Sequence, residues 1–123
     1  MNPNQFALEW AAAWNRRDIE AVVAHFADDV QFTSPTALAV TGSAAVLGKS
    51  ALRDYWRTAM ARIDALTFTL TRVLWDAAQR ELAIIYVAEI NGSARSVSEN
   101  LIFNEQDLVA RAEVFHGAPI ATT

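Results

Sequence analysis

The chain has 123 residues, of which 53% are hydrophobic, and it carries a formal net charge of -4. This length and composition predict one domain spanning residues 1–123, built around a single core. The acidic balance argues against a nucleic-acid partner, which needs a basic face, and the absence of cysteine excludes disulfides and thiolate chemistry.

A first helix is predicted from about Pro3 to Asn15. Asn2 is a good capping residue, and proline fits the first helical position because its missing N–H would be unpaired there in any case. Helical spacing gives this segment one apolar stripe, formed by Phe6, Trp10, Ala13 and Trp14.

A second helix is predicted to begin at Asp18, whose carboxylate can accept the unpaired N–H groups of the first turn. Helical spacing then places four apolar residues on one stripe, namely Ile19, Val22, Val23 and Phe26. After Asp28 and Asp29 the period changes to two, which indicates a strand with Val30, Phe32 and Ser34 on one face. Pro35 cannot donate to a β-ladder, so we expect the strand to end there.

The segment from Thr36 to Leu47 is small and polar to weakly apolar, which suggests a mobile flap near a pocket mouth. Ser50 is expected to cap the next helix. The apolar stripe of that helix contains Leu52, Tyr55, Trp56, Ala59, Met60 and Ile63, and the opposite face is charged.

The remaining sequence reads as strands because it is rich in β-branched and aromatic residues. We expect strands at residues 67–75, 81–90, 94–104 and 108–116. Asn91-Gly92 is a strong signal for a two-residue hairpin turn, and the tail from Gly117 is expected to fray. Helices followed by a long antiparallel sheet make an α+β domain.

Three motifs carry a family resemblance. They are W-N-x-x-D at residues 14–18, F-A-D-D-V-x-F-x-x-P at residues 26–35, and the run from Gly48 to Leu52 that opens a helix. Together they resemble the nuclear transport factor 2-like superfamily, in particular its SnoaL-like and ketosteroid-isomerase-like members. The resemblance covers nearly the whole chain and implies a cone-shaped α+β barrel, with three N-terminal helices packed on a highly curved antiparallel sheet that encloses a pocket. It does not determine the activity, because this fold carries many unrelated functions.

Strand alternation indicates which polar residues enter that pocket. If Leu101 and Phe103 face inward, Val97 and Glu99 do so as well. In the last strand we place His116 inward with the small apolar residues, because the opposite register would bury Arg111 and Glu113. An alternative stays open, in which Glu99 faces solvent or pairs with Arg95 or Arg111.

Glu99 and His116 would then form a polar pair among apolar walls. Desolvation would raise the pKa of the Glu99 carboxyl, so that it could donate a hydrogen bond to a developing oxyanion, while a neutral His116 could take a proton. The ketosteroid-isomerase-like pattern has a protonated aspartic acid at the position matching Glu99 and a tyrosine at the position matching Trp10. Its general-base aspartate is replaced here by Ser34, which lacks an adjacent base, so steroid isomerisation by that route is not expected.

Two functions remain as hypotheses. One is a SnoaL-like, cofactor-free isomerase- or cyclase-type enzyme that acts on an apolar carbonyl or polycyclic substrate, with Glu99 and His116 as catalytic residues. The other is a non-catalytic binding or dimerisation module for a small hydrophobic ligand. In either case the expected ligand-contacting residues are Trp10, Phe26, Phe32, Ser34, Tyr55, Trp56 and Phe103.

The strand at residues 82–90 is apolar on both faces, and no further helix follows that could cover the second face. A second copy of the chain is the simplest cover, so we predict a homodimer through the outer sheet face. The interface residues are predicted to be Ile85, Val87, Ile102 and Phe115, with Arg95, Arg111 and Glu113 as the polar part.

Other partners and cofactors are not expected. No apolar stretch is long enough to span a bilayer, and the N-terminus has neither the basic region nor the apolar core of a secretion signal. We therefore expect no membrane partner and a cytoplasmic location. With only His25 and His116 available, a zinc site would need carboxylates, and we expect neither a metal nor another cofactor.

Overall fold

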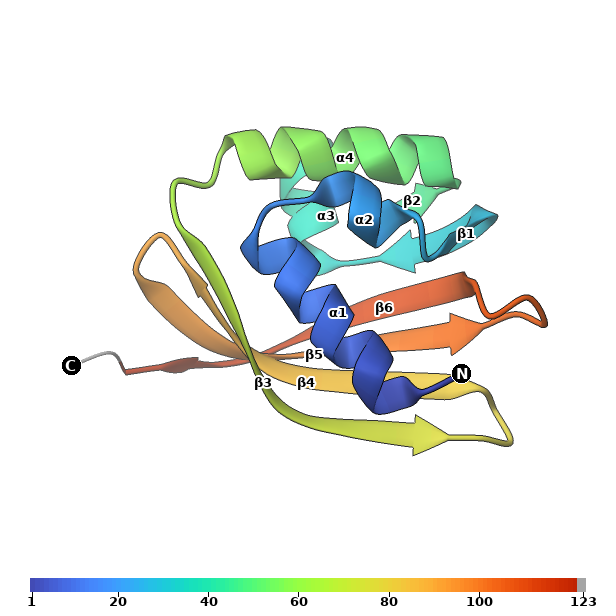
Figure 1. Ribbon diagram of the computed structural model, residues 1–123. Helices are drawn as coiled ribbons and strands as arrows, with labels where there is room; N and C mark the ends of the chain where they lie inside the picture. Colours follow the sequence, from blue (N-terminus) through green and yellow to red (C-terminus); the bar gives the residue numbers. More distant parts are fainter. Residues whose placement is uncertain (122–123) are drawn as a thin grey trace.

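The computed structural model describes residues 1–121 and shows helices packed against a curved, unclosed six-stranded sheet (Figure 1). The helices are α1 (Pro3–Asn15), α2 (Ile19–Val23), α3 (Pro35–Thr41) and α4 (Lys49–Ala61). The strands are β1 (Phe26–Thr33), β2 (Ala45–Leu47), β3 (Leu66–Asp76), β4 (Glu81–Ile90), β5 (Ser93–Phe103) and β6 (Val109–Ile120). The predicted α+β class is confirmed, although residues 1–121 contain four helices and not three.

The sheet has the strand order β2-β1-β6-β5-β4-β3. All neighbouring strands are antiparallel except β1 and β6, which run parallel with Phe32 beside Ala112 and Thr33 beside Glu113. This parallel pair joins segments far apart in the sequence. It places Ser34, directly after β1, next to the part of β6 that carries Val114 and His116.

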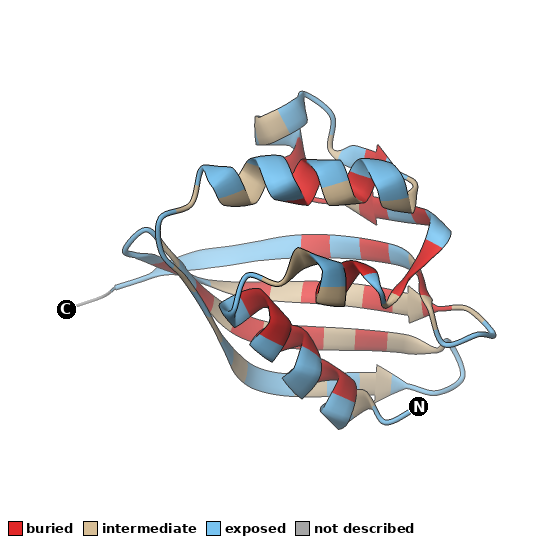
Figure 2. Cartoon of the chain, turned by 45° about the horizontal axis from the view of Figure 1, so that its top comes forward, coloured by how far each residue is buried: buried red, intermediate tan, exposed pale blue. Residues whose placement is uncertain are grey.

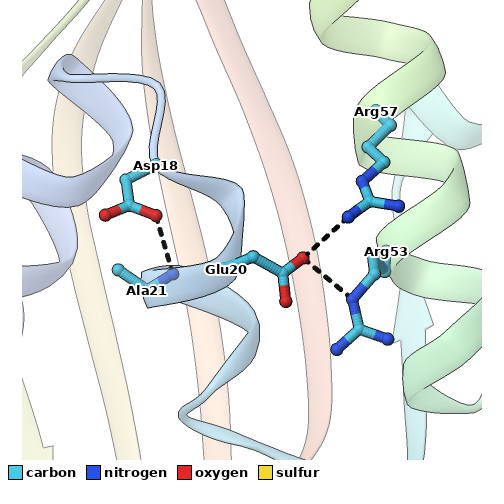
Figure 3. A network of polar contacts seen from close by, with 5 residues as sticks. All are labelled: Asp18, Glu20, Ala21, Arg53 and Arg57. Carbon is cyan, nitrogen blue, oxygen red and sulfur yellow. Dashed lines mark hydrogen bonds and ion pairs between the residues drawn. The ribbon is translucent and has the colours of Figure 1, made fainter.

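The predicted caps of the first two helices are confirmed. The side chain of Asn2 accepts a hydrogen bond from the Gln5 N–H at 3.0 Å, and Asp18 accepts one from the Ala21 N–H at 3.0 Å (Figure 3). Helix α2 ends at Val23, so Phe26 is not on its stripe but is the first residue of β1, where it is fully buried.

Helices α2 and α4 are also joined by charge. Glu20 projects from α2 toward α4, where its carboxylate accepts hydrogen bonds from Arg53 at 2.9 Å and Arg57 at 3.1 Å (Figure 3). These side chains are largely solvent-exposed, and exposed ion pairs contribute only about 0–1 kcal/mol each. The cluster therefore orients α2 against α4 without dominating stability.

Three local predictions were wrong. The segment after Ser34 is not an irregular flap, because Ser34 caps α3 by accepting from the Thr36 N–H and Pro35 occupies the first helical turn. The next residues form β2, which pairs with β1. Helix α4 is preceded by Gly48 at a positive φ of 91° and not by a Ser50 cap, and β6 continues past Gly117 to Ile120 because it pairs with β5.

The hairpin between β4 and β5 is confirmed. Asn91 and Gly92 both have positive φ angles, 51° and 84°, as a type I′ turn requires. The Asn91 side chain also accepts hydrogen bonds from the Asp64 and Ala65 N–H groups at 2.8 and 3.0 Å. The turn thus holds the chain between α4 and β3 in place.

The core lies between the concave face of the sheet and the helices, and the buried residues of α1 face the sheet (Figure 2). Val97, Glu99, Leu101 and Phe103 are all buried, whereas Arg111 and Glu113 are exposed, which confirms the predicted inward register of β5 and of β6 as far as Val114. His116, which was also predicted to face inward, is exposed. Among the described residues, no helix has the length and apolar character needed to cross a membrane.

Candidate functional site

A small cavity lies between helix α4 and the concave face of the sheet. Its volume is about 110 Å³. The walls are mostly aromatic and come from α1, α4, β1, β3 and β4, with Trp14, Phe32, Trp56, Phe68 and Tyr86 as the large side chains. The polar residues that line it are Ser34, Thr36, Tyr55, Tyr86, Glu99 and His116. Such a cavity excludes most water and leaves a few polar groups to orient a ligand.

Glu99 is the buried acid of this cavity, with 5% of its surface exposed. It lies in the middle of the sheet, between Ile84 on β4 and Val114 on β6. Neither Arg95 nor Arg111 forms an ion pair with it anywhere in residues 1–121, and its Oε2 atom has no hydrogen-bond partner. The alternatives of a solvent-facing or salt-bridged Glu99 are therefore wrong.

Burial raises the pKa of Glu99 to about 8, because the charged carboxylate loses its hydration. The indole N–H of Trp10 lies near the carboxyl and partly opposes this rise in pKa. The contact is too poorly aligned to count as a hydrogen bond, since Trp10 Nε1 and Glu99 Oε2 are both without a partner. At neutral pH the Glu99 side chain is thus mainly protonated and can donate an O–H.

His116 lies at the rim of the cavity on β6, opposite Val97 of β5. Partial burial lowers its pKa, and the nearby positive charge of Arg95 lowers it further, so the imidazole is neutral at pH 7. Glu99 and His116 line the same cavity, but the described residues include no hydrogen bond or ion pair between the two. Any cooperation between them would pass through a bound ligand.

Ser34 and Tyr55 form a second polar group on the opposite wall. The Ser34 hydroxyl is occupied as the cap of α3, where it accepts from the Thr36 N–H at 3.2 Å. Burial raises the pKa of Tyr55 to about 12, the neighbouring Ser34 hydroxyl partly offsets this, and Glu99 adds to it. Tyr55 therefore stays protonated at neutral pH and can only donate or accept a hydrogen bond.

Six of the nine residues proposed from the sequence meet at this cavity, namely Phe32, Ser34, Tyr55, Trp56, Glu99 and His116. The other three do not line it. Trp10 lies behind the wall, stacked on Phe68 and edge-on to Tyr86. Phe26 packs edge-on against Trp56, and Phe103 packs against Phe6 and Trp75, because the first turns of α1 fill the narrow end of the core.

The sequence reasoning missed several wall residues, chiefly Trp14, Met60 and Phe68, and it left the orientation of Tyr86 open. Trp14 and Met60 were on correctly predicted apolar stripes, but a stripe does not distinguish a cavity wall from filled core. Tyr86 faces inward with Ile84 and Ala88, which alternation could not show because both faces of β4 are apolar.

Arg95 is not on the outer sheet face where the sequence reasoning placed it. The β4–β5 register pairs Arg95 with Ala88, Val97 with Tyr86, and Glu99 with Ile84. Paired residues point to the same side of a sheet, so Arg95 belongs to the concave face, at its outer end. No group of three His, Asp or Glu side chains within residues 1–121 is arranged to bind a metal ion.

Solved structures with the same fold are numerous. A SnoaL-like protein of unknown function from Burkholderia thailandensis E264 superposes with a TM-score of 0.83 at 28% identity, with 94% of each chain covered. TerC, co-crystallised with polyporic acid, superposes with a TM-score of 0.77 at 15% identity, covering 94% of this chain and 92% of TerC. A putative ketosteroid isomerase from Kribbella flavida DSM 17836 gives 0.71 at 21% identity, with coverages of 95% and 78%.

No curated protein matches this chain in sequence. The family is nevertheless shown by the sequence itself, because the SnoaL-like domain matches residues 7–103, which is most of the chain. That match agrees with the curved sheet and the helices that cover it. The chain therefore belongs to the SnoaL-like domain family.

Proposed function

We propose that this protein binds a small, mostly apolar molecule that carries an acceptor oxygen, and acts on it as a cofactor-independent isomerase- or cyclase-type enzyme. The observation that supports this most directly is the buried Glu99 carboxyl, which lines an aromatic cavity and has an unpaired oxygen. A buried polar group without a partner costs about 1–3 kcal/mol, which a ligand oxygen accepting from Glu99 would recover.

The proposed chemistry is proton transfer next to a carbonyl group. Neutral His116 takes a proton from the carbon beside the carbonyl, and the electron pair of the broken C–H bond moves to form an enolate. The developing negative charge on the enolate oxygen is stabilised by the O–H of Glu99. Where the ligand has a carbon–carbon double bond next to that carbon, the enolate is conjugated with it. Return of the proton from the imidazolium to the far end of the conjugated system then shifts the double bond, completes an isomerisation and restores both side chains.

The cavity volume limits the size of the ligand. An engineered protein cavity of about 150 Å³ holds one benzene molecule. The cavity here, at about 110 Å³, suits a single ring or a chain of similar size. A polycyclic ligand would exceed this volume.

The experiment that tests the function is ligand binding by Glu99→Gln. We expect single-ring ketones to bind the wild-type protein and to shift the NMR signal of the Glu99 carboxyl carbon. The variant should bind them about tenfold more weakly, because an amide N–H is a poorer donor to an oxygen than a carboxylic acid O–H. The exposed Glu105→Gln, in the turn between β5 and β6, is the matched control and should bind like wild type. Equal affinities for all three proteins would refute the assignment of Glu99.

A non-catalytic binding protein is the second candidate. It is favoured by Ser34, which replaces the general-base aspartate of ketosteroid-isomerase-like members and is already engaged as the α3 cap. The two candidates differ in one measurable property. An enzyme of the proposed kind exchanges the ligand's protons beside the carbonyl for deuterium in D₂O, and His116→Gln slows that exchange, whereas a binding protein leaves those protons in place.

We also propose a homodimer through the outer sheet face. Phe115 is 49% exposed there, the flanking Ile85, Val87 and Ile102 are partly exposed, and a groove of about 220 Å³ runs along Arg111 and Glu113. Phe115→Arg should give a monomer in sedimentation velocity, since a buried unpaired charge opposes association. Leu38→Arg, an equally exposed apolar position on α3, is the control and should leave the dimer intact. A Phe115→Arg protein that still sediments as a dimer would exclude this interface.

A further inference from the structure

We propose that the ligand carries a negative charge, such as a carboxylate, which Arg95 binds at the mouth of the cavity while the acceptor oxygen meets Glu99 inside. This inference rests on the proposed function, because it assumes that the inner cavity is the binding site. It narrows the ligand class from small ketones to small oxo acids.

The first observation is a basin that continues the inner cavity outward. It has a volume of about 440 Å³. Five residues line both spaces, namely Thr36, Ala88, Ile90, Val97 and His116. Arg95, Ser93 and Pro119 line only the outer basin. A ligand too long for the inner cavity would therefore extend into a space with Arg95 on its wall.

The second observation is the order of side chains along β5. Arg95, Val97 and Glu99 share the concave face, and His116 stands beside Val97 on β6. Four residues of a strand span about 13 Å, so Arg95 and Glu99 mark the two ends of one continuous path. An arginine side chain is long and flexible, which shortens the gap that the ligand must bridge.

The third observation is the charge at the mouth. Arg95 takes part in no ion pair within residues 1–121, and no Asp or Glu lines the outer basin. Glu89 is adjacent to Ala88 on β4, so its side chain points to the other sheet face. Glu99 is mainly protonated at neutral pH and does not balance the charge of Arg95.

These groups suit an anion of a specific kind. A guanidinium group binds a carboxylate with two parallel hydrogen bonds, and this geometry favours a planar carboxylate over a neutral amide. The neutral His116 and the hydroxyls of Thr36 and Ser93 supply further hydrogen-bonding groups on the same walls. The protein as a whole is acidic, with a net charge of -4. An unpaired cation at the mouth of an apolar cavity therefore gives this site a local preference for an anionic ligand.

The experiment compares two matched probes. One is a cyclohexanone that carries a carboxylate on the ring carbon opposite the carbonyl, and the other is the corresponding carboxamide. We expect wild type to bind the carboxylate at least tenfold more tightly, by calorimetry at low salt, with a smaller preference at high salt. Arg95→Gln should reduce the preference to within twofold. Arg62→Gln removes an exposed cation that lines neither the inner cavity nor the outer basin, and it should keep the wild-type preference.

The outcomes separate this inference from the proposed function. Equal binding of both probes to wild type, with affinities that still fall in Glu99→Gln, overturns the anion site and leaves the proposed function standing. A carboxylate preference that persists in Arg95→Gln also overturns it, since the anion is then bound elsewhere. If neither probe binds wild type and the Glu99 carboxyl signal does not shift, the proposed function fails and the anion site fails with it.

Discussion

Ionisation of Glu99 should lower the free energy of unfolding by about 4 kcal/mol as the pH rises from about 5 to about 9, and Glu99→Gln should abolish most of that loss. The Glu99 carboxyl has a pKa of about 8 in the folded protein, against an ordinary value of 4.5. Between these two values the folded state keeps a proton that the unfolded state has released. Stability therefore falls as the pH rises through this window and levels off above pH 8.

Other groups affect different parts of the pH range. The pKa values of His25 and His116 are lowered by burial, so their contribution makes stability rise with pH, and only below about 6.5. The raised pKa of Tyr55 matters only above about pH 10. The interval from pH 7 to 9 is therefore the one in which Glu99 acts alone among the groups with shifted pKa values.

Urea unfolding at pH 5, 7 and 9 measures this effect. Wild type and the exposed control Glu105→Gln should lose stability in parallel, while Glu99→Gln stays nearly level above pH 7. At pH 5 the three proteins should be similar, because Glu99 is protonated in the folded wild type and an amide has nearly the same shape. A flat wild-type profile, or a Glu99→Gln profile that declines like wild type, would show that the carboxyl is not buried as a neutral acid.

The local features of the fold were predictable from the sequence, because each depends on neighbours in the chain. Asn2 and Asp18 cap helices, Asn91-Gly92 forms the turn, and strand β4 was predicted residue for residue as 81–90. The parallel pairing of β1 with β6 was not predicted. It depends on contacts between segments about 80 residues apart, which hydrophobic periodicity cannot detect because it reflects only local sequence.

The candidate site was likewise predicted in part, and one part that was missed depends on long-range packing. Alternation correctly placed Glu99 among the inward residues, on the same face as Leu101 and Phe103. The same alternation, continued from Val97 to Arg95, also points Arg95 inward, and the assignment of Arg95 to the outer interface was inconsistent with it. The exclusion of Phe103 from the cavity could not be predicted, as it follows from the way α1 crosses the sheet and brings Phe6 against it.

Trp10→Ala should destabilise the protein by about 3–5 kcal/mol, the usual cost of removing a buried aromatic side chain. Trp10 is fully buried, and it packs against Phe68 at 5.7 Å and Tyr86 at 5.0 Å between ring centroids. Both neighbours line the cavity, so the loss would also loosen its wall. Urea unfolding at pH 6, where Glu99 is protonated, gives the packing cost alone. A loss below about 1 kcal/mol would mean that Trp10 is not a core residue.

Trp10→Phe separates the second role of this residue from packing. It keeps an aromatic ring but removes the indole N–H that favours the ionised form of Glu99, so the pKa of Glu99 should rise further above 8. Trp14→Phe is the matched control, because Trp14 also has a buried, unpartnered Nε1 but does not affect the pKa of Glu99. NMR titration of the Glu99 carboxyl carbon in the two variants measures this difference. Equal shifts in both would mean that general loosening of the core, and not the Trp10 N–H, sets the pKa of the acid on which the proposed chemistry depends.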